Sequence, residues 1–155
     1  MANKEVIERL TAHIEKLPER FIQIPQDIRL RKPAPDKWSP QEILGHLIDS
    51  AINNLKRFTE TQFLPQPSTV IPYQQDDLVL VNKYQQLRVE DLLLLWQGLN
   101  RQIVNVIKFM PAEKLDYTVI TPSGEAKTLH WLIVDYTDHM EHHLRQIFGP
   151  ESVLP

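Results

Sequence analysis

Residues 38–60, WSPQEILGHLIDSAINNLKRFTE, decide the fold because they fix where a long central helix begins and how far it runs. Ser39 and Glu42 form a capping box, in which the serine hydroxyl accepts a hydrogen bond from the Glu42 amide and the glutamate side chain reaches back to the Ser39 amide. Pro40 takes the first helical position, where its missing N–H costs no hydrogen bond. The stretch therefore predicts a helix from Pro40 to about Glu60.

Three further long helices are predicted on either side of this one, because proline-free stretches carry apolar residues at helical spacing. A linker from Pro18 to Lys37 is expected after the first of them, and Gly149-Pro150 ends the last. The predicted ranges are 3–17, 89–110 and 128–148.

The connections between these helices are long and carry little regular structure. A short helix is predicted over 74–88, and a turn or small hairpin over 115–127. The residues of the short helix expected to face inward are Leu78, Val81, Asn82 and Tyr84. Four amphipathic helices with long connecting loops predict an all-α four-helix bundle that forms one domain over 1–155.

Composition indicates a folded, non-membrane protein. Hydrophobic residues make up 42% of the chain and charged residues 24%, which is ordinary for a globular domain. The net charge of −3, with basic residues scattered, argues against a nucleic-acid partner. The charged N-terminal stretch resembles neither a signal peptide nor a membrane span, so we expect a cytoplasmic protein. With no cysteine, disulfides and thiolate metal sites are excluded, and any thiol must come from outside.

The stretch 138-DHMEHHLRQI-147 contains three of the six histidines. Their spacing places His139 and His143 on adjacent turns of one helix face, whereas His142 points elsewhere. Such a pair is half of a site for zinc, nickel, copper or iron, and equally a pair of packed histidines. Of the candidates for a third ligand, His13 is expected to be exposed. His46 lies on a polar stripe of its helix that either faces solvent or lines a cleft.

The motif Trp-Ser-Pro-x-Glu-Ile-x-x-His-Leu over 38–47, followed by His-x-x-x-His-x-x-Gln-Ile over 139–147, resembles the DinB-like superfamily. These bacterial four-helix bundles include the bacillithiol and mycothiol S-transferases. The resemblance implies that His46, His139 and His143 form a three-histidine site for a divalent transition metal, at one end of the bundle. It also implies that homodimers are possible.

Other polar residues are expected near such a site. Carboxylates commonly orient metal-binding histidines, and Asp49 and Asp135 are placed by spacing to do so. Asn53, Arg57 and Gln146 are candidate pocket residues, and Arg57 could meet a substrate carboxylate. The tryptophans are interpreted as packing residues.

Three functions remain open from the sequence. Three neutral imidazoles leave coordination positions free, which is typical of a catalytic metal. The first hypothesis is a transferase in which the metal activates an external low-molecular-weight thiol for attack on an electrophilic small molecule. The second is a hydrolase that activates water, and the third is a non-catalytic, stress-associated module. No Glu-x-x-His, His-Glu-x-x-His or Gly-x-Ser-x-Gly motif is present, which argues against di-iron, zincin and α/β-hydrolase chemistry.

Overall fold

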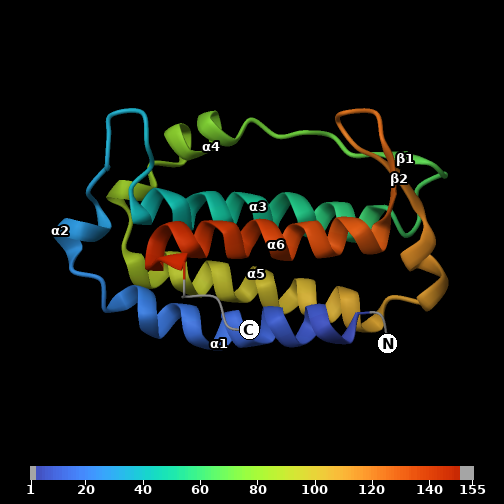
Figure 1. The fold of residues 1–155 in the computed structure, drawn as a ribbon, viewed down its shortest axis with the longest axis horizontal. Coiled ribbons are helices and arrows are strands. Elements are labelled where there is room, and N and C mark those ends of the chain that lie inside the picture. The colour runs from blue at the N-terminus through green and yellow to red at the C-terminus, as the bar shows by residue number, and fades with distance from the viewer. Residues whose placement is uncertain (1–2, 151–155) are drawn as a thin grey trace.

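The computed structural model describes residues 3–150 and shows a bundle of four long helices (Figure 1). Neighbouring pairs are α1 with α5, α5 with α3, α3 with α6, and α6 with α1. Helices α3 and α5 run in one direction and α1 and α6 in the other. The bounds are α1 Lys4–Ile22, α3 Pro40–Glu60, α5 Val89–Phe109 and α6 Leu129–Phe148.

Because α3 and α5 are parallel neighbours, the chain must return along the whole bundle between them. The returning segment, residues 61–88, crosses over the outside of α3 and α6 at the top of Figure 1. It contains β1 (Ser68–Thr69), α4 (Gln75–Asn82) and the 3₁₀ turn η1 (Tyr84–Gln86). This crossover gives the outer face of the α3–α6 pair a cover.

A three-stranded sheet lies at the end of the bundle where α3 ends and α6 begins. The predicted small hairpin is confirmed as β2 (Thr118–Ile120) paired antiparallel with β3 (Ala126–Thr128). Strand β1 lies in a connection expected to carry little regular structure, and it pairs in parallel with β2, with Ser68 opposite Val119. The remaining short elements are α2 (Gln26–Arg29) and η2 (Ala112–Asp116).

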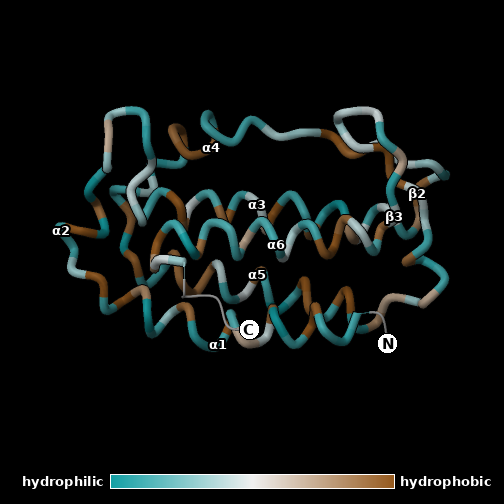
Figure 2. The backbone as a smooth tube through the Cα atoms, viewed as in Figure 1, coloured by the Kyte–Doolittle hydropathy of each residue, from teal (hydrophilic) through white to brown (hydrophobic). Residues whose placement is uncertain are grey.

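The four long helices are amphipathic and bury their apolar faces in a common core. Figure 2 shows apolar and polar residues alternating along each of them at helical intervals. Trp96, Phe21, Phe58 and Met140 are among the largest buried side chains, so Trp96 is a packing residue as predicted. Among residues 3–150, no helix has the length and apolarity needed to cross a bilayer.

Helix α1 runs five residues beyond its predicted end, because Pro18 is accommodated inside it. A proline in a helix leaves the carbonyl four residues earlier without its usual amide donor, here the carbonyl of Ile14. The side chain of Gln97 on α5 donates to this oxygen over 3.0 Å. A side chain distant in sequence thus replaces the missing hydrogen bond. The linker expected from Pro18 therefore begins only after Ile22.

The capping box at the start of α3 is confirmed. The Ser39 hydroxyl accepts from the Glu42 amide over 3.1 Å, and the Ser39 amide donates to Glu42 Oε2 over 2.9 Å. One turn further, Gly45 allows the Tyr84 ring to pack directly on the helix, since a Cβ there would lie 2.0 Å from the ring. The close contact brings the Tyr84 hydroxyl to Asp49 Oδ1, 2.5 Å away.

A short helix is present within the predicted range, but some of the residues expected to face inward are exposed. Val81 is 65% exposed and Asn82 is also exposed, whereas Val79 is buried. The helix is only Gln75–Asn82, and Lys83 at φ 55° turns the chain so that Tyr84 points into the core. The helical period assumed through residue 84 is therefore broken at Lys83.

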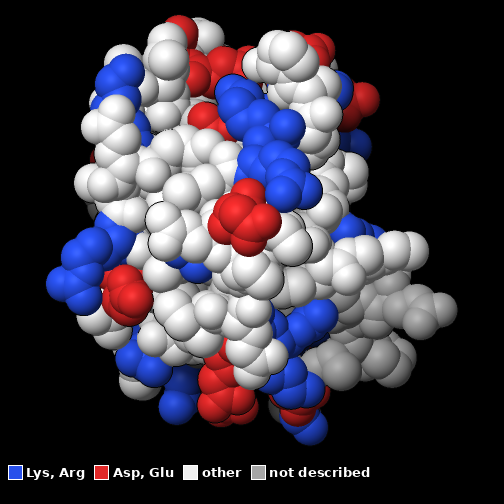
Figure 3. All heavy atoms as spheres, turned by 90° about the vertical axis from the view of Figure 1, so that its left-hand side faces the viewer, with Lys and Arg blue, Asp and Glu red and all other residues white. Residues whose placement is uncertain are grey.

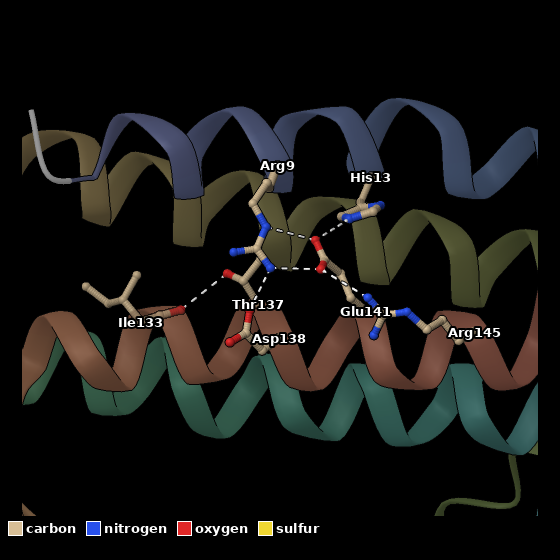
Figure 4. Close-up of polar contacts among 7 residues, drawn as sticks. All are labelled: Arg9, His13, Ile133, Thr137, Asp138, Glu141 and Arg145. Atoms are coloured by element: carbon tan, nitrogen blue, oxygen red, sulfur yellow. Dashed lines mark hydrogen bonds and ion pairs between the residues drawn. The ribbon is translucent and has the colours of Figure 1, made fainter. Parts of the chain in front are cut away.

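A polar cluster joins α6 to α1 (Figure 4). Arg9 donates from Nε and Nη2 to the two carboxylate oxygens of Glu141, at 3.0 and 2.8 Å, and from Nη2 to Asp138 at 2.6 Å. His13, expected to be exposed, is buried, with Nε2 3.0 Å from Glu141 Oε1. The cluster fixes the rotation of α6 at the level of His139 and His143, which lie on either side of Glu141 in sequence.

Candidate metal centre

Figure 1 shows that α3 begins and α6 ends at the same end of the bundle. Three histidines on these two helices meet in the half of the bundle toward that end. His46 lies in the second turn of α3, and His139 and His143 lie on adjacent turns of α6. These two helices pack against one another, and His46 contacts His139 on α6, whereas Asp49 one turn later is hydrogen-bonded to the crossover segment. His46 is 0% exposed, which excludes the alternative in which it faces solvent.

The ring nitrogens of the three histidines converge. His139 Nε2 lies 3.2 Å from His46 Nε2 and 3.1 Å from His143 Nε2. The ring planes are close to perpendicular, with interplanar angles of 72° to 81°. All three side chains offer one nitrogen within 4.8 Å of the others, a geometry that suits a shared divalent cation.

The environment keeps these imidazoles neutral. Burial, followed by the neighbouring His143 and His139, lowers the pKa of His46 to about 3. Burial, with His143 and His142, lowers the pKa of His139 to about 4. Burial also lowers the pKa of His143, against the opposing effect of its hydrogen bond to Gln146. Neutral rings have lone pairs available, which is the protonation state that a metal requires.

Gln146 orients one of the three rings. Its Oε1 lies 2.8 Å from His143 Nδ1, so the imidazole donates from Nδ1 and leaves Nε2 without a proton, facing the other two rings. The amide nitrogen of Gln146 lies 3.3 Å from His142 Nε2 on the exposed side. Gln146, predicted as a pocket residue, thus accepts the hydrogen bond from a histidine ring that was expected to go to a carboxylate.

The two predicted carboxylates make no hydrogen bond to the histidine rings among residues 3–150. Asp49 accepts hydrogen bonds from Tyr84 and, at 3.1 Å, from Asn82, and its Oδ2 is buried without a partner among residues 3–150. His46 Nδ1 is likewise buried without a hydrogen-bond partner within that range. Asp135 is exposed and, within the described chain, makes no hydrogen bond to His139. Contact between either carboxylate and a histidine ring stays a prediction.

A cleft of about 430 Å³ opens beside the histidines. His143 and Gln146 line it from α6, and Asp76 lines it from the crossover segment. Trp38, interpreted from the sequence as a packing residue, also lines the cleft, and its ring centroid lies 4.7 Å from that of His46. A small molecule in this cleft would contact the indole on one side and reach the cluster at His143.

Arg57 and Asn53 do not line this cleft. Both line a separate cavity of about 170 Å³ near the C-terminal half of α3. Arg57 also lines a third cavity, together with Asp135. Both residues lie further along α3 than His46, so they face cavities beyond the histidine cleft.

The end of the bundle that carries the histidines shows charged side chains of both signs, interspersed over a largely uncharged surface (Figure 3). A continuous basic surface, as a nucleic-acid backbone requires, is not visible on this face.

Comparisons with known proteins agree with this architecture. A protein of Bacillus mycoides strain KBAB4, provisionally named a metal-dependent hydrolase, is 26% identical over 149 residues, which cover 93% of this chain and 84% of that protein. A Bacillus cereus strain AH820 protein with the same provisional name is equally similar.

Solved structures show the same fold. YfiT from Bacillus subtilis, described provisionally as a metal-dependent hydrolase with an unusual four-helix bundle topology, superposes with a TM-score of 0.84 at 19% identity, covering 94% of this chain and 83% of YfiT. A mycothiol-dependent maleylpyruvate isomerase has a TM-score of 0.70 at 10% identity, covering 91% of this chain and 59% of that one. The sequence model of the DinB superfamily matches residues 4–147, and this chain therefore belongs to the DinB superfamily.

Proposed function

We propose that this protein is a metal-dependent enzyme in which His46, His139 and His143 hold one divalent transition metal ion and the adjoining cleft binds a small substrate. The observation that carries the proposal is the convergence of three Nε2 atoms, 3.1 and 3.2 Å apart, beside a cleft of about 430 Å³. Three protein ligands leave coordination positions for substrate, as in catalytic metal sites. A divalent cation there supplies Lewis-acid activation of a small nucleophile.

The reaction we favour is transfer of an external low-molecular-weight thiol to an electrophilic small molecule. In a substitution, the thiol sulfur forms a bond to the electrophilic carbon, the leaving group departs from that carbon, and the thiol proton goes to solvent. The cleft has room for a ligand much larger than water, and the chain has no cysteine to serve as an internal nucleophile. The fold shared with a mycothiol-dependent isomerase supports an external thiol as co-substrate.

Hydrolysis is the second candidate, and it is favoured by the names given to the relatives. Two Bacillus proteins at 26% identity, and YfiT by fold, are described provisionally as metal-dependent hydrolases. The same three ligands can activate water. The two reactions differ in one requirement, since only the transferase needs a thiol.

The residues of the chain have separate tasks in either reaction. The α1–α6 cluster around Glu141 holds α6 against rotation, and Gln146 keeps His143 Nε2 free of a proton. Trp38 covers one side of the His46 ring and restricts the access of water to it. These contacts preorganise the ligands, so that little rearrangement is needed when an ion binds.

The test begins with the metal content of the untagged protein. Wild type, His143→Ala and the matched control His142→Ala are depleted with a mild chelator, reloaded with zinc, nickel, iron or copper, and analysed by inductively coupled plasma mass spectrometry. We expect about one ion per chain in wild type and His142→Ala and none in His143→Ala. If all three proteins retain the same amount of metal, or if none of them retains any, the proposed metal site is contradicted.

The reaction is tested on the metal-loaded protein. The conversion of a fluorogenic electrophile is measured with and without an added thiol. Hydrolysis of ester and amide substrates is measured in parallel. Activity that requires the thiol supports transfer, and activity without it supports hydrolysis. If His46→Ala retains every activity measured for the wild type, the site is not catalytic and the third hypothesis, a non-catalytic module, is supported.

A further inference from the structure

A second cavity adjoins the histidine cleft. It has a volume of about 290 Å³ and lies between α3, α6 and the crossover segment. Gln75 lines both this cavity and the histidine cleft, so the two are neighbours along one side of the bundle. The other residues of interest that line it are Arg57, Tyr73, Trp131 and Asp135.

Arg57 brings a half-buried positive charge to this cavity. Its Nη2 donates to the Ile71 carbonyl over 2.6 Å and its Nη1 to Asn54 Oδ1 over 3.3 Å, and the Tyr73 ring lies 5.3 Å from the guanidinium carbon. Among residues 3–150, no carboxylate oxygen lies within 4.0 Å of this guanidinium. A partly desolvated cation with only neutral partners is stabilised by any anion that enters.

Asp135 brings a negative charge to the same cavity. It lies on α6, one turn before His139, and its side chain is only partly covered; this partial burial together with Asp138 raises the pKa of the carboxyl, while Arg57 opposes the rise. Within the described chain its carboxylate has neither a hydrogen bond nor an ion pair at 4.0 Å or less. The cavity thus presents two opposite charges that are not paired with each other.

We propose that this cavity, the Arg57–Asp135 subsite, binds the zwitterionic, amino-acid-like end of the small substrate whose reactive end lies at the histidines. Arg57 would bind the carboxylate and Asp135 the ammonium group, with Tyr73 and Trp131 as apolar walls. The proposal rests on the proposed function only for the placement of the reactive end, since recognition of the zwitterion needs no metal.

The spacing along the helices sets the size of this substrate. Arg57 lies eleven residues after His46 on α3, about 16 Å along the helix axis, and Asp135 lies four residues before His139 on α6, about 6 Å. An extended tripeptide, at most about 11 Å long, spans the shorter distance. Helical side chains point toward the N-terminus of their helix, so the long Arg57 side chain covers part of the longer one. Among external thiols, a short cysteine-containing peptide has both the sulfur and the amino-acid end that the two cavities require.

The test uses the metal-free protein and S-methylglutathione, whose blocked sulfur leaves the γ-glutamyl amino-acid end as the recognised group. Binding is followed by the NMR signal of the Trp131 indole N–H and by isothermal titration. We expect saturable binding that Arg57→Gln weakens at least ten-fold. The matched control Arg101→Gln, an exposed arginine on α5, should bind as wild type does.

The ammonium contact is tested separately. Asp135→Asn should weaken binding of S-methylglutathione, and it should leave binding of the N-acetylated probe, which lacks the positive charge, unchanged. Arg57→Lys keeps the charge and serves as a folded reference if Arg57→Gln loses stability, and it should bind more tightly than Arg57→Gln.

Three outcomes overturn the subsite: no binding to wild type, equal binding by wild type, Arg57→Gln and Arg57→Lys, or an equal effect of Asp135→Asn on both probes. A failure of the proposed metal site can be distinguished from a failure of the subsite, because metal content and probe binding are measured separately. His46→Ala should lose the metal but keep the affinity for S-methylglutathione.

Discussion

His143 Nδ1 lies 2.8 Å from the side-chain oxygen of Gln146, less than one helical turn away on α6. This hydrogen bond decides which nitrogen of His143 carries the proton, and so which one faces His46 and His139. A residue that touches no ion is therefore expected to control how tightly the ion is held.

Gln146→Ala should lower the affinity for zinc by about 10- to 100-fold, because His143 loses its orienting acceptor. Competition with a chromophoric chelator measures the change. Gln146→Glu retains an acceptor oxygen at the same place and is the matched variant. If Gln146→Ala and Gln146→Glu bind zinc alike and as wild type does, the hydrogen bond has no such role.

The affinity for zinc should change little between pH 7.5 and pH 6. The pKa values of His46 and His139 are lowered to about 3 and 4, and that of His143 is lowered as well, so few protons compete with the metal at pH 6. Three imidazoles of ordinary pKa would lose roughly 50-fold over this range, because each becomes mostly protonated. Titration of the same protein at the two pH values distinguishes these results, and a loss near 50-fold contradicts the lowered pKa values.

Gly45→Ala should destabilise the fold by about 1 to 3 kcal/mol, since the new methyl group would overlap the Tyr84 ring and the ring would have to move away from Asp49. Gly98→Ala is the control, because no atom other than those of its chain neighbours and its own helix backbone lies within 4 Å of a Cβ at this position in the interior of α5. There the substitution should stabilise by about 1 kcal/mol through helix propensity. Urea unfolding measures both, and equal effects would contradict the described contact.

Arg9→Ala should lower the free energy of unfolding by about 2 kcal/mol, because it leaves the buried Glu141 carboxylate without its bidentate partner. Lys4→Ala removes an exposed pair with Glu8 on the same helix and should change stability by less than about 1 kcal/mol. Chemical denaturation provides the comparison. A similar small effect of both substitutions would show that the α1–α6 cluster does not contribute as described.

The bundle and its metal candidates were predictable because their signals are local. The capping box of Ser39 and Glu42 spans four residues, and the spacing of His139 and His143 is a property of one helix. The third histidine was different. Spacing left His46 between a solvated stripe and a cleft, and only the family resemblance favoured the cleft, because which helix covers that stripe depends on the packing of distant segments.

The features that the sequence did not predict all depend on partners far along the chain. Pro18 remains inside α1 because Gln97 supplies a hydrogen bond, and β1 forms because residues near Val119 lie beside it. His13 is buried because Glu141 lies opposite, 128 residues later. No periodicity within a single segment carries information of this kind.

The two helices that supply the histidines are separated by 68 residues, and His46 and His139 lie 93 residues apart. During synthesis, a ribosome-bound chain that has emerged only as far as α5 has one of the three ligands and cannot chelate an ion through all of them. Tight binding of the metal would therefore require that α6 has been synthesised and folded. An ion that binds only the native state also shifts the folding equilibrium by mass action, so that the acquisition of the metal would protect finished molecules from degradation.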